Sequence, residues 1–390
     1  MCNFRFRRTF YPVGQGAFFT EKFLDQNDKV FFSVVYDCGK GLSAKSFDST
    51  LKKLVDYAFE KDEIIDVLFI SHFDSDHVNG IHLLKKHFDN NTKVFVPFSE
   101  KNGIVLKVLY PYVESTMNLF SEEQIFYVDD EDTESEFLDS LSLDDLSHSR
   151  NASIRSGQPL KYKDLWYYVP FDIGDNIFKQ NISQIIKQCY QNALQQGMNP
   201  DEIIKKLREK YKGAETPAIS KTTAINMNSL QVLSFAHNDL HKKFFYLNNR
   251  WLDDYFEYSC YNTFNWKWIH IKNASCLYTG DTSFSAQMKN GEVLLYHVLI
   301  KKVVKLLEKL SSFDCLELIQ IPHHGSKYNY INDVALDDKV LSAFVNYSPE
   351  HAKAKFDSRI FFDFFFANKP LYSITDYSSR PTFYDITCGF

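Results

Sequence analysis

The sequence predicts a layered α/β fold. Short runs rich in β-branched and aromatic residues alternate with helical patterns over residues 1–100, and similar runs return over residues 222–390. Residues 101–221, between them, are helical and acidic in character. We therefore expect one fold built from two halves, with the middle range as an insertion.

Three runs in the first half have the composition of strands, and one pattern has the period of a helix. The runs are VFFSVVYD (30–37), IIDVLFIS (64–71) and KVFVPFS (93–99), and the helical pattern is VNGIHLLKKHF (78–88). This succession of strands and a helix is typical of a layered α/β protein.

The middle range begins with acidic residues and ends in a predicted helical hairpin. Eleven acidic residues and no Lys or Arg lie from Glu122 to Asp145, and residues 147–159 have the composition of a loop. Two helical segments follow over residues 181–211. They are broken just before Pro200, which suits the first turn of a helix.

The second half again combines strands and helices. Helices are predicted at 292–310 and at about 352–367. The aromatic run RIFFDFFF (359–366) is expected in the core, with a partner-binding face as the alternative. Strands are predicted at 229–236, 244–247, 274–281, 315–322, 339–348, 371–376 and 382–386.

Composition limits the function and the compartment. The 390 residues carry a net charge of −6, so a polyanion would have to be held by a local basic patch or by metal ions. The seven cysteines are odd in number and form no CxxC pair, which favours reduced thiols. We find neither a signal peptide nor an apolar run of the ~20 residues that a membrane span needs, and we expect a cytoplasmic protein with no membrane partner.

The strongest chemical signal is SHFDSDHVNG (71–80), directly after an apolar strand. In an extended segment residues i and i+2 face the same side, so His72 and Asp74 can converge on one ion. Asp76 and His77, at the start of the following helix, can bind a second ion. The alternative is a polar loop whose aspartates only cap the helix.

Two further predicted strands end in residues that bind metals. LYTGD puts the carboxylate of Asp281 where it could bridge two ions, and IPHHGS offers the imidazoles of His323 and His324. Either segment alone could be structural. Three ligand-rich strand ends in one chain predict a metal site.

These motifs resemble the metallo-β-lactamase superfamily, in particular the branch that contains the hydrolase domain of the competence protein ComEC. That branch has HPDxDHxGG, LLTGD and PHHGS in the same order. Weaker similarities are VGQGAFF (13–19) with VVYDCGK (34–40), Asn228-Ser229-Leu230 with the family's NxSLVL, and Ser373-Ile374-Thr375-Asp376 with its last strand. The resemblance covers residues 1–100 and 222–390.

The resemblance implies an αββα four-layer sandwich with the site at one edge of the two sheets, and it implies two divalent ions, Zn²⁺ and/or Mn²⁺. His324 is favoured as the histidine ligand of the IPHHGS segment, and His323 as a proton donor or phosphate contact. Asp76 is expected to orient a metal-bound hydroxide as well as to bind metal. The implied metal ligands are His72 and Asp74 on one ion, Asp76 and His77 on the other, Asp281 as a bridge, and His324.

Several positions are candidates for contact with substrate. Asn228, Ser229, Ser326 and Lys327 are expected near a bound phosphate, with an ordinary turn as the alternative for Ser326. The segment around His351 departs from the family's usual GHP-like sequence. His351 is therefore either a substrate contact or a surface histidine.

The resemblance and the predicted metals together favour a hydrolase that cleaves phosphodiester bonds, either a nuclease or a nucleotide phosphodiesterase. Its expected partner is DNA, RNA or a nucleotide. One alternative is a small-molecule phosphodiesterase similar to phosphorylcholine esterases. Another is a partner-binding subunit with a gated metal site, in which residues 101–221 contact a protein. Proteins of this type resemble components of bacterial anti-phage or mobile-element systems, so a role in defence is one expectation.

Overall fold

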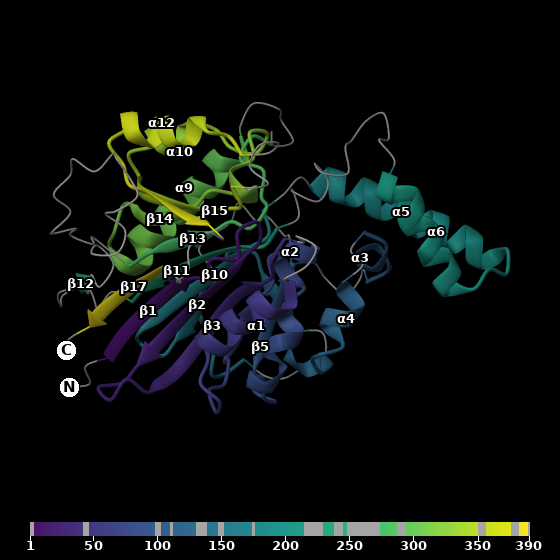
Figure 1. Ribbon diagram of the computed structural model, residues 1–390. Coiled ribbons are helices and arrows are strands. Elements are labelled where there is room, and N and C mark those ends of the chain that lie inside the picture. The colour runs from purple at the N-terminus through teal and green to yellow at the C-terminus, as the bar shows by residue number, and fades with distance from the viewer. Residues whose placement is uncertain are drawn as a thin grey trace.

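A computed structural model of the chain describes residues 4–41, 47–97, 103–109, 112–129, 139–146, 152–173, 176–213, 229–237, 245–247, 274–286, 294–349, 356–375 and 382–388. Over these ranges the chain forms two mixed β-sheets with helices packed against them, which confirms the predicted α/β class (Figure 1).

The first sheet has nine strands within the described ranges. Strands β17, β1, β2 and β3 pair antiparallel with one another in that order. Strands β3, β4, β5, β6 and β8 then pair parallel in that order. In spatial order they are β12 (Phe245–Leu247), β17 (Thr382–Cys388), β1 (Phe4–Phe10), β2 (Phe18–Leu24), β3 (Val30–Cys38), β4 (Val67–Phe69), β5 (Lys93–Pro97), β6 (Ile125–Asp129) and β8 (Ala152–Arg155).

The second sheet has eight strands in the part of the chain that the structure describes. Strands β13 to β16 are parallel, whereas β9, β10, β11 and β13 pair antiparallel. The order is β16 (Leu371–Thr375), β15 (Val340–Tyr347), β14 (Leu316–Gln320), β13 (Cys276–Tyr278), β11 (Gln231–Ala236), β10 (Trp166–Phe171), β9 (Leu160–Tyr162) and β7 (Leu141–Ser142).

The main hydrophobic core lies between the sheets and is largely aromatic. Phe6 stacks on Trp166 with ring centroids 4.1 Å apart, and Phe32 stacks on Tyr162 at 3.5 Å, so rings of the first sheet interdigitate with rings of the second. The central strands are covered on both faces, so β4 and β14 are buried along their whole length, and β4 is entirely apolar.

Helices cover the outer face of each sheet and form two further cores (Figure 1). Against the first sheet lie α1 (Phe47–Ala58), α2 (Ser75–Val78), the 3₁₀ helix η1 (Ile81–His87), α4 (Val113–Met117) and the 3₁₀ turn η3 (Glu122–Gln124). Against the second lie α9 (Leu295–Ser311), α10 (Asp333–Leu336), α12 (Arg359–Phe366) and the 3₁₀ turn η6 (His323–Gly325). A separate unit consists of α3 (Gly103–Leu109), α5 (Asn176–Gln195) and α6 (Pro200–Gly213).

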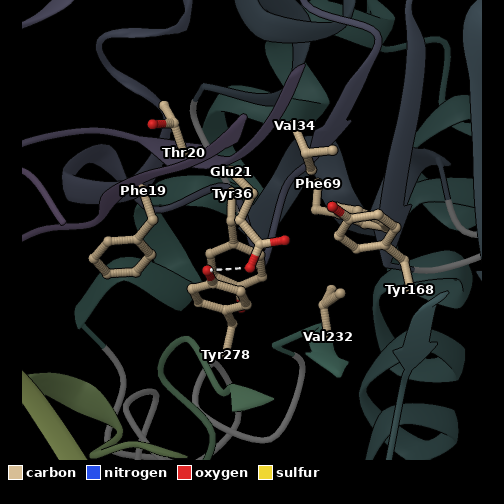
Figure 2. Close-up of a pocket in the computed structure, with 9 residues that line it drawn as sticks. All are labelled: Phe19, Thr20, Glu21, Val34, Tyr36, Phe69, Tyr168, Val232 and Tyr278. Carbon is tan, nitrogen blue, oxygen red and sulfur yellow. Dashed lines mark hydrogen bonds between the residues drawn. The ribbon is translucent and has the colours of Figure 1, made fainter. Parts of the chain in front are cut away.

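A buried ion pair joins the sheets inside the aromatic core. Arg8 Nε donates to Glu21 Oε1 at 2.7 Å, and both side chains are almost wholly buried. From the second sheet, the Tyr278 hydroxyl donates to the same oxygen at 2.8 Å and the Ser234 hydroxyl donates to Glu21 Oε2 at 2.7 Å. Figure 2 shows the Glu21–Tyr278 bond in the wall of a small cavity between the sheets. The cavity is lined by core side chains and is separate from the predicted site.

The middle range is not the separate insertion that the sequence predicted. Strands β6 and β8 belong to the first sheet, while β7, β9 and β10 belong to the second, because their apolar residues pack in the common core. The predicted helical hairpin is present as α5 and α6. Part of the acidic stretch forms η3 and β6, and residues 130–138 lie outside the described ranges.

Three local features differ from what the sequence predicted. Strands β1 and β2 were not predicted, although Phe4, Phe6 and Phe10 alternate with polar residues. The helix predicted at 78–88 is instead the single turn α2 followed by η1, because Gly80 packs closely against the Cys38 carbonyl. Helix α12 buries Ile360 and Phe364 but exposes four phenylalanines: Phe361, Phe362, Phe365 and Phe366.

Within the described ranges, we find no helix whose length and apolar character would allow it to cross a membrane.

We predict that Glu21→Ala strongly destabilises the protein. The substitution leaves the Arg8 guanidinium buried without its carboxylate, a defect that costs about 3–5 kcal/mol. Urea unfolding followed by tryptophan fluorescence measures the loss. Asp56→Ala, which removes the exposed Asp56–Lys86 pair, is the control and should cost less than about 1 kcal/mol. Equal losses in the two variants would contradict a structural role for the buried pair.

Candidate metal centre

The predicted ligands lie where three buried strands end. His72 follows β4, Asp281 follows β13, and His323 with His324 follows β14. Strands β13 and β14 are parallel neighbours, so their carboxyl ends lie at the same edge of the second sheet. The Leu230 N–H donates to the Ser71 carbonyl at 2.7 Å, which joins the end of β4 in the first sheet to that edge.

Tight backbone packing brings these strand ends together. Gly280 has a φ of +54°, and a Cβ there would lie 2.8 Å from Ser71 Cβ. A Cβ at Gly39 would lie 2.4 Å from the backbone of Asp76 in α2. Only glycine allows these approaches. At these two glycines the backbone approaches too closely to leave room for a side chain.

The histidine pair lies in a strained turn. His323 and His324 have φ values of 48° and 55°, and Gly325 follows at 74°. Side chains other than glycine rarely adopt this left-handed region, and each such residue costs on the order of 1 kcal/mol. The turn directs both imidazoles toward Asp281. Closely fitting neighbours hold it, since a Cβ on Gly325 would lie 2.7 Å from the Phe356 ring.

The carboxylate of Asp281 lies at the centre of four imidazoles. Its Oδ1 is 3.2 Å from His77 Nε2 and 3.8 Å from His324 Nε2. Its Oδ2 is 3.0 Å from His323 Nδ1 and 3.7 Å from His72 Nε2. Each carboxylate oxygen therefore faces its own pair of histidines.

Two more carboxylates complete the cluster at its exposed side. Asp76 Oδ2 lies 3.3 Å from His324 Nε2, and Asp74 Oδ2 lies 3.8 Å from His72 Nε2. The Asp76 side chain is 24% exposed and the Asp74 side chain 33%, whereas His72 and His77 are fully buried. The cluster thus opens to solvent on the side of these two aspartates.

Several buried atoms of the cluster have no hydrogen bond of normal geometry among the described residues. Burying such an atom without a partner costs about 1–3 kcal/mol, so native structures seldom contain several together. The separations between neighbouring atoms, 3.0–3.8 Å, bracket the ~3.3 Å expected between two ligands on a tetrahedral ion with bonds of about 2.0 Å. The cluster could therefore hold a metal ion. The atoms are His72 Nε2, His77 Nε2, His323 Nδ1, His324 Nε2 and Asp281 Oδ1.

A buried carboxylate behind the cluster orients two of the histidines. Asp37 Oδ2 lies 2.8 Å from His77 Nδ1 and accepts the Ser71 hydroxyl at 2.5 Å. Since the Ser71 proton is given to Asp37, Ser71 Oγ can accept the Nδ1–H of His72, 2.9 Å away. Both imidazoles then carry their proton on Nδ1, which leaves the Nε2 lone pairs directed at Asp281.

His324 is oriented in the same way by the backbone. Its Nδ1 lies 3.2 Å from the Asn346 carbonyl and 3.4 Å from the Gly16 N–H. The two contacts require opposite protonation of Nδ1. We favour donation to Asn346, because it is the shorter contact and leaves Nε2 free to face Asp76.

Burial and mutual charge shift the pKa values of the cluster in opposite directions. Burial, with the charge of His77, lowers the pKa of His72 to about 4. Burial also opposes protonation of His77, but Asp281 and Asp37 outweigh it and raise its pKa well above its usual value. The charges of His323 and His77 likewise outweigh burial at Asp281 and hold its pKa well below its usual range. At neutral pH a proton on His77 therefore occupies the place of a metal ion.

Of the predicted substrate contacts, Ser229, Ser326 and Lys327 are among the described residues. Ser229 is fully buried; its hydroxyl accepts the Asp281 N–H at 3.0 Å and lies 3.3 Å from His72 Nδ1, so it supports ligands from behind. Ser326 is buried in the turn after η6, and the exposed Lys327 ammonium lies over the Tyr328 ring at 4.8 Å. Asn228 and His351 lie outside the described residues.

Sequence reasoning missed the residues behind the ligands. Asp37, in VVYDCGK, and Ser71, in SHFDSDHVNG, have no predicted role. Asp37 could have been found, because a carboxylate at the end of an apolar strand needs a partner once it is buried. Asn346 could not, because its backbone carbonyl makes the contact and the side chain gives no signal.

Comparison with protein-family models and with curated proteins gave no match to this chain in either case.

We predict that Asp37→Asn weakens metal binding about 10–100-fold, the usual effect of losing a group that orients a histidine ligand. Asparagine keeps the size of the side chain and tolerates the φ of 54° at this position. Competition with a chelating dye gives the affinity, and Asp56→Asn on the exposed face of α1 is the control. Unchanged affinity in Asp37→Asn would show that Asp37 only stabilises the fold.

We also predict that metal binding releases protons. Because the pKa of His77 is raised, its Nε2 is protonated at pH 7 in the metal-free protein and must lose that proton on binding, whereas His72 is already neutral. Apparent affinity should therefore rise from pH 6 to pH 8, with release of at least about one proton at pH 7. Calorimetric titration in buffers of different ionisation enthalpy counts the protons. A heat of binding that is independent of the buffer would contradict the prediction.

Proposed function

We propose that the chain is a metal-dependent hydrolase of the metallo-β-lactamase fold that cleaves phosphodiester bonds with two divalent ions. The observation that carries the proposal is the division of one cluster into two sets of ligands around Asp281. The Oδ2 side has His72, His323 and Asp74, and the Oδ1 side has His77, His324 and Asp76.

Asp281 is the group best suited to bridge the ions. His77 is close enough to join both possible trios, His72–His77–Asp281 and Asp76–His77–His324. An imidazole nitrogen has only one lone pair, however, and can serve only one ion. A carboxylate has two oxygens, and those of Asp281 face different histidines.

The fold is consistent with this family. Two sheets with a common core and helices on both outer faces correspond to an αββα sandwich. The ligands occur along the chain in the order of the ComEC-like motifs, SHFDSDHVNG, LYTGD and IPHHGS. The order of motifs and the order of layers are independent observations, and both favour the same family.

The donor set favours a phosphodiester substrate. Two divalent ions in such a site lower the pKa of a bound water and neutralise charge on a phosphoryl oxygen. The three carboxylates that face the site, Asp74, Asp76 and Asp281, would leave an excess positive charge beside two such ions, which suits an anionic ester. Oxygen and nitrogen ligands without cysteine suit Zn²⁺, Mn²⁺ or one of each.

Two residues have the exposure that a role in proton transfer needs. Asp76 borders the open side, where its carboxylate can orient a nucleophilic water as well as bind metal. His323 is 14% exposed with Nδ1 toward Asp281, and its pKa is raised because the charge of Asp281 outweighs burial. It can bind an ion beside Asp281 through Nδ1, or give a proton to the leaving alcohol from its other ring nitrogen, Nε2.

We predict that metal-stripped protein regains hydrolysis of single- and double-stranded DNA, RNA or bis-p-nitrophenyl phosphate when Mn²⁺ or Zn²⁺ is restored. Metal analysis should then find two ions per chain. Asp76→Ala should lower the rate at least about 100-fold, since it removes a metal ligand. His82→Ala, at an exposed histidine of η1, is the control and should keep both metals and activity.

The pattern of substrates separates the remaining alternatives. Cleavage of polymers supports a nuclease, and cleavage of the small ester alone supports a small-molecule phosphodiesterase. Full metal loading without cleavage of any substrate would contradict the proposal and favour a subunit that acts only with a partner.

A further inference from the structure

We propose that the unit formed by α3, α5 and α6 binds the sugar–phosphate backbone of a nucleic acid and holds the polymer beside the metal cluster. The proposal rests on the proposed function and narrows its substrate to a polymer.

The three helices form a unit with its own core. Val105 and Val108 of α3 pack with Ile186 of α5 and with Ile203 and Leu207 of α6, separately from the cores of the sheets. Figure 1 shows α5 and α6 extending away from the two sheets. A projecting unit of this kind offers surface that the sheets do not need for stability.

The unit is basic in a chain that is acidic. Over residues 103–109 and 176–213 there are eight Lys or Arg and three Asp or Glu, a formal charge of +5. Since the whole chain has a net charge of −6, the remainder carries −11. Five of the basic residues lie within the eight residues from Lys205 to Lys212 of α6. A short segment so rich in lysine and arginine is typical of nucleic-acid surfaces.

Two of these lysines lie on the face of α6 that points away from the core. Ile203, Ile204 and Leu207 are buried, whereas Lys205 and Lys206 are exposed. Lys210 is one turn beyond Lys206 on the same helix. Lys205 and Lys206 are therefore accessible to a ligand.

Other charges of the unit are engaged within the protein. Arg208 Nε donates to the Lys107 carbonyl at 2.7 Å, and Lys107 pairs with Glu114 of α4 at 3.0 Å. Lys206 pairs with Glu202 at 2.9 Å, but both ends are more than half exposed, and such a pair is worth less than about 1 kcal/mol. A phosphate can therefore compete for Lys206, whereas Arg208 anchors the unit.

The unit joins the sheets at the edge that carries the ligands. Helix α3 follows the carboxyl end of β5, whose parallel neighbour β4 leads to His72. Helix α5 follows β10, whose last residue, Phe171, pairs with Gln231, two residues from Ser229 behind the cluster. Both attachments are thus within a few residues of the metal centre. A polymer bound to this unit could extend along it toward the edge that carries the ligands.

A polymer makes use of this arrangement in a way that a small ester cannot. Each phosphate contacted by a lysine releases counterions, so several distant contacts add affinity that depends steeply on salt. A small ester reaches only the metal cluster. Neutralising the α6 lysines should therefore affect the two kinds of substrate differently.

The test compares full-length Lys205→Gln/Lys206→Gln/Lys210→Gln with a matched variant on α9, Lys301→Gln/Lys305→Gln/Lys309→Gln. Glutamine has nearly the helix propensity of lysine, and each variant removes three positive charges from one helix. Fluorescence anisotropy of labelled single-stranded and duplex oligonucleotides, on metal-free protein over a range of salt, measures binding without cleavage. Hydrolysis of bis-p-nitrophenyl phosphate by the metal-loaded protein measures the catalytic activity of the metal cluster.

The α6 variant should bind oligonucleotides at least about tenfold more weakly at low salt. The slope of log K against log[salt] for duplex binding should be shallower by about 0.9 for each phosphate that the lysines no longer neutralise. Its hydrolysis of the small ester should equal that of the α9 variant. Equal binding by both variants, or no oligonucleotide binding by the unaltered protein, would overturn the proposal. Because binding is measured on metal-free protein, the anisotropy result tests this proposal even if the metal-loaded protein cleaves no substrate.

Discussion

The carboxylate of Asp281 at the centre of four imidazoles is the contact on which the site depends. Its two oxygens face different histidine pairs at 3.0–3.8 Å, and these histidines come from the ends of β4 and β14 and from α2. That arrangement requires the strand ends to meet closely, which explains the glycines at 39 and 280 and the left-handed turn at His323 and His324. Backbone strain and close packing here serve the geometry of the side chains.

Energetics favour a cation in this cluster. Five buried nitrogen or oxygen atoms without normal hydrogen bonds would together cost on the order of 5–15 kcal/mol, comparable with the whole stability of a typical domain. Protons on His77 and His323 offset part of that cost, as their raised pKa values indicate. A metal ion offsets more of it, because it satisfies several lone pairs at once. Asp37 and Ser71 keep the Nε2 atoms of His72 and His77 directed inward, so little reorganisation is needed on binding.

Sequence patterns predicted the ligands better than their surroundings. The ligand residues of all three motifs lie together in the structure, because each follows an apolar strand and strands of this kind end at a common edge. Strands β6 to β10 were missed as parts of the sheets. Acidic residues at 129–145 surround β7 and follow most of β6, and residues 147–159, which contain β8, have the composition of a loop. Ser229 was predicted to contact substrate because the sequence does not show how deeply a residue is buried. In the structure its hydroxyl lies behind the ligands, against His72 Nδ1 and the Asp281 N–H. Contacts made by backbone atoms, such as that of the Asn346 carbonyl with His324, cannot be predicted from the types of side chain in the sequence.

Anomalous diffraction from crystals of the protein loaded with Mn²⁺ or Zn²⁺ is the most decisive test of the proposed two-metal centre. We predict two peaks about 3.5–4 Å apart, one at bonding distance from His72 and one from His77, with Asp281 between them. A single peak, or peaks at surface carboxylates with the cluster empty, would contradict a two-metal centre held by Asp281.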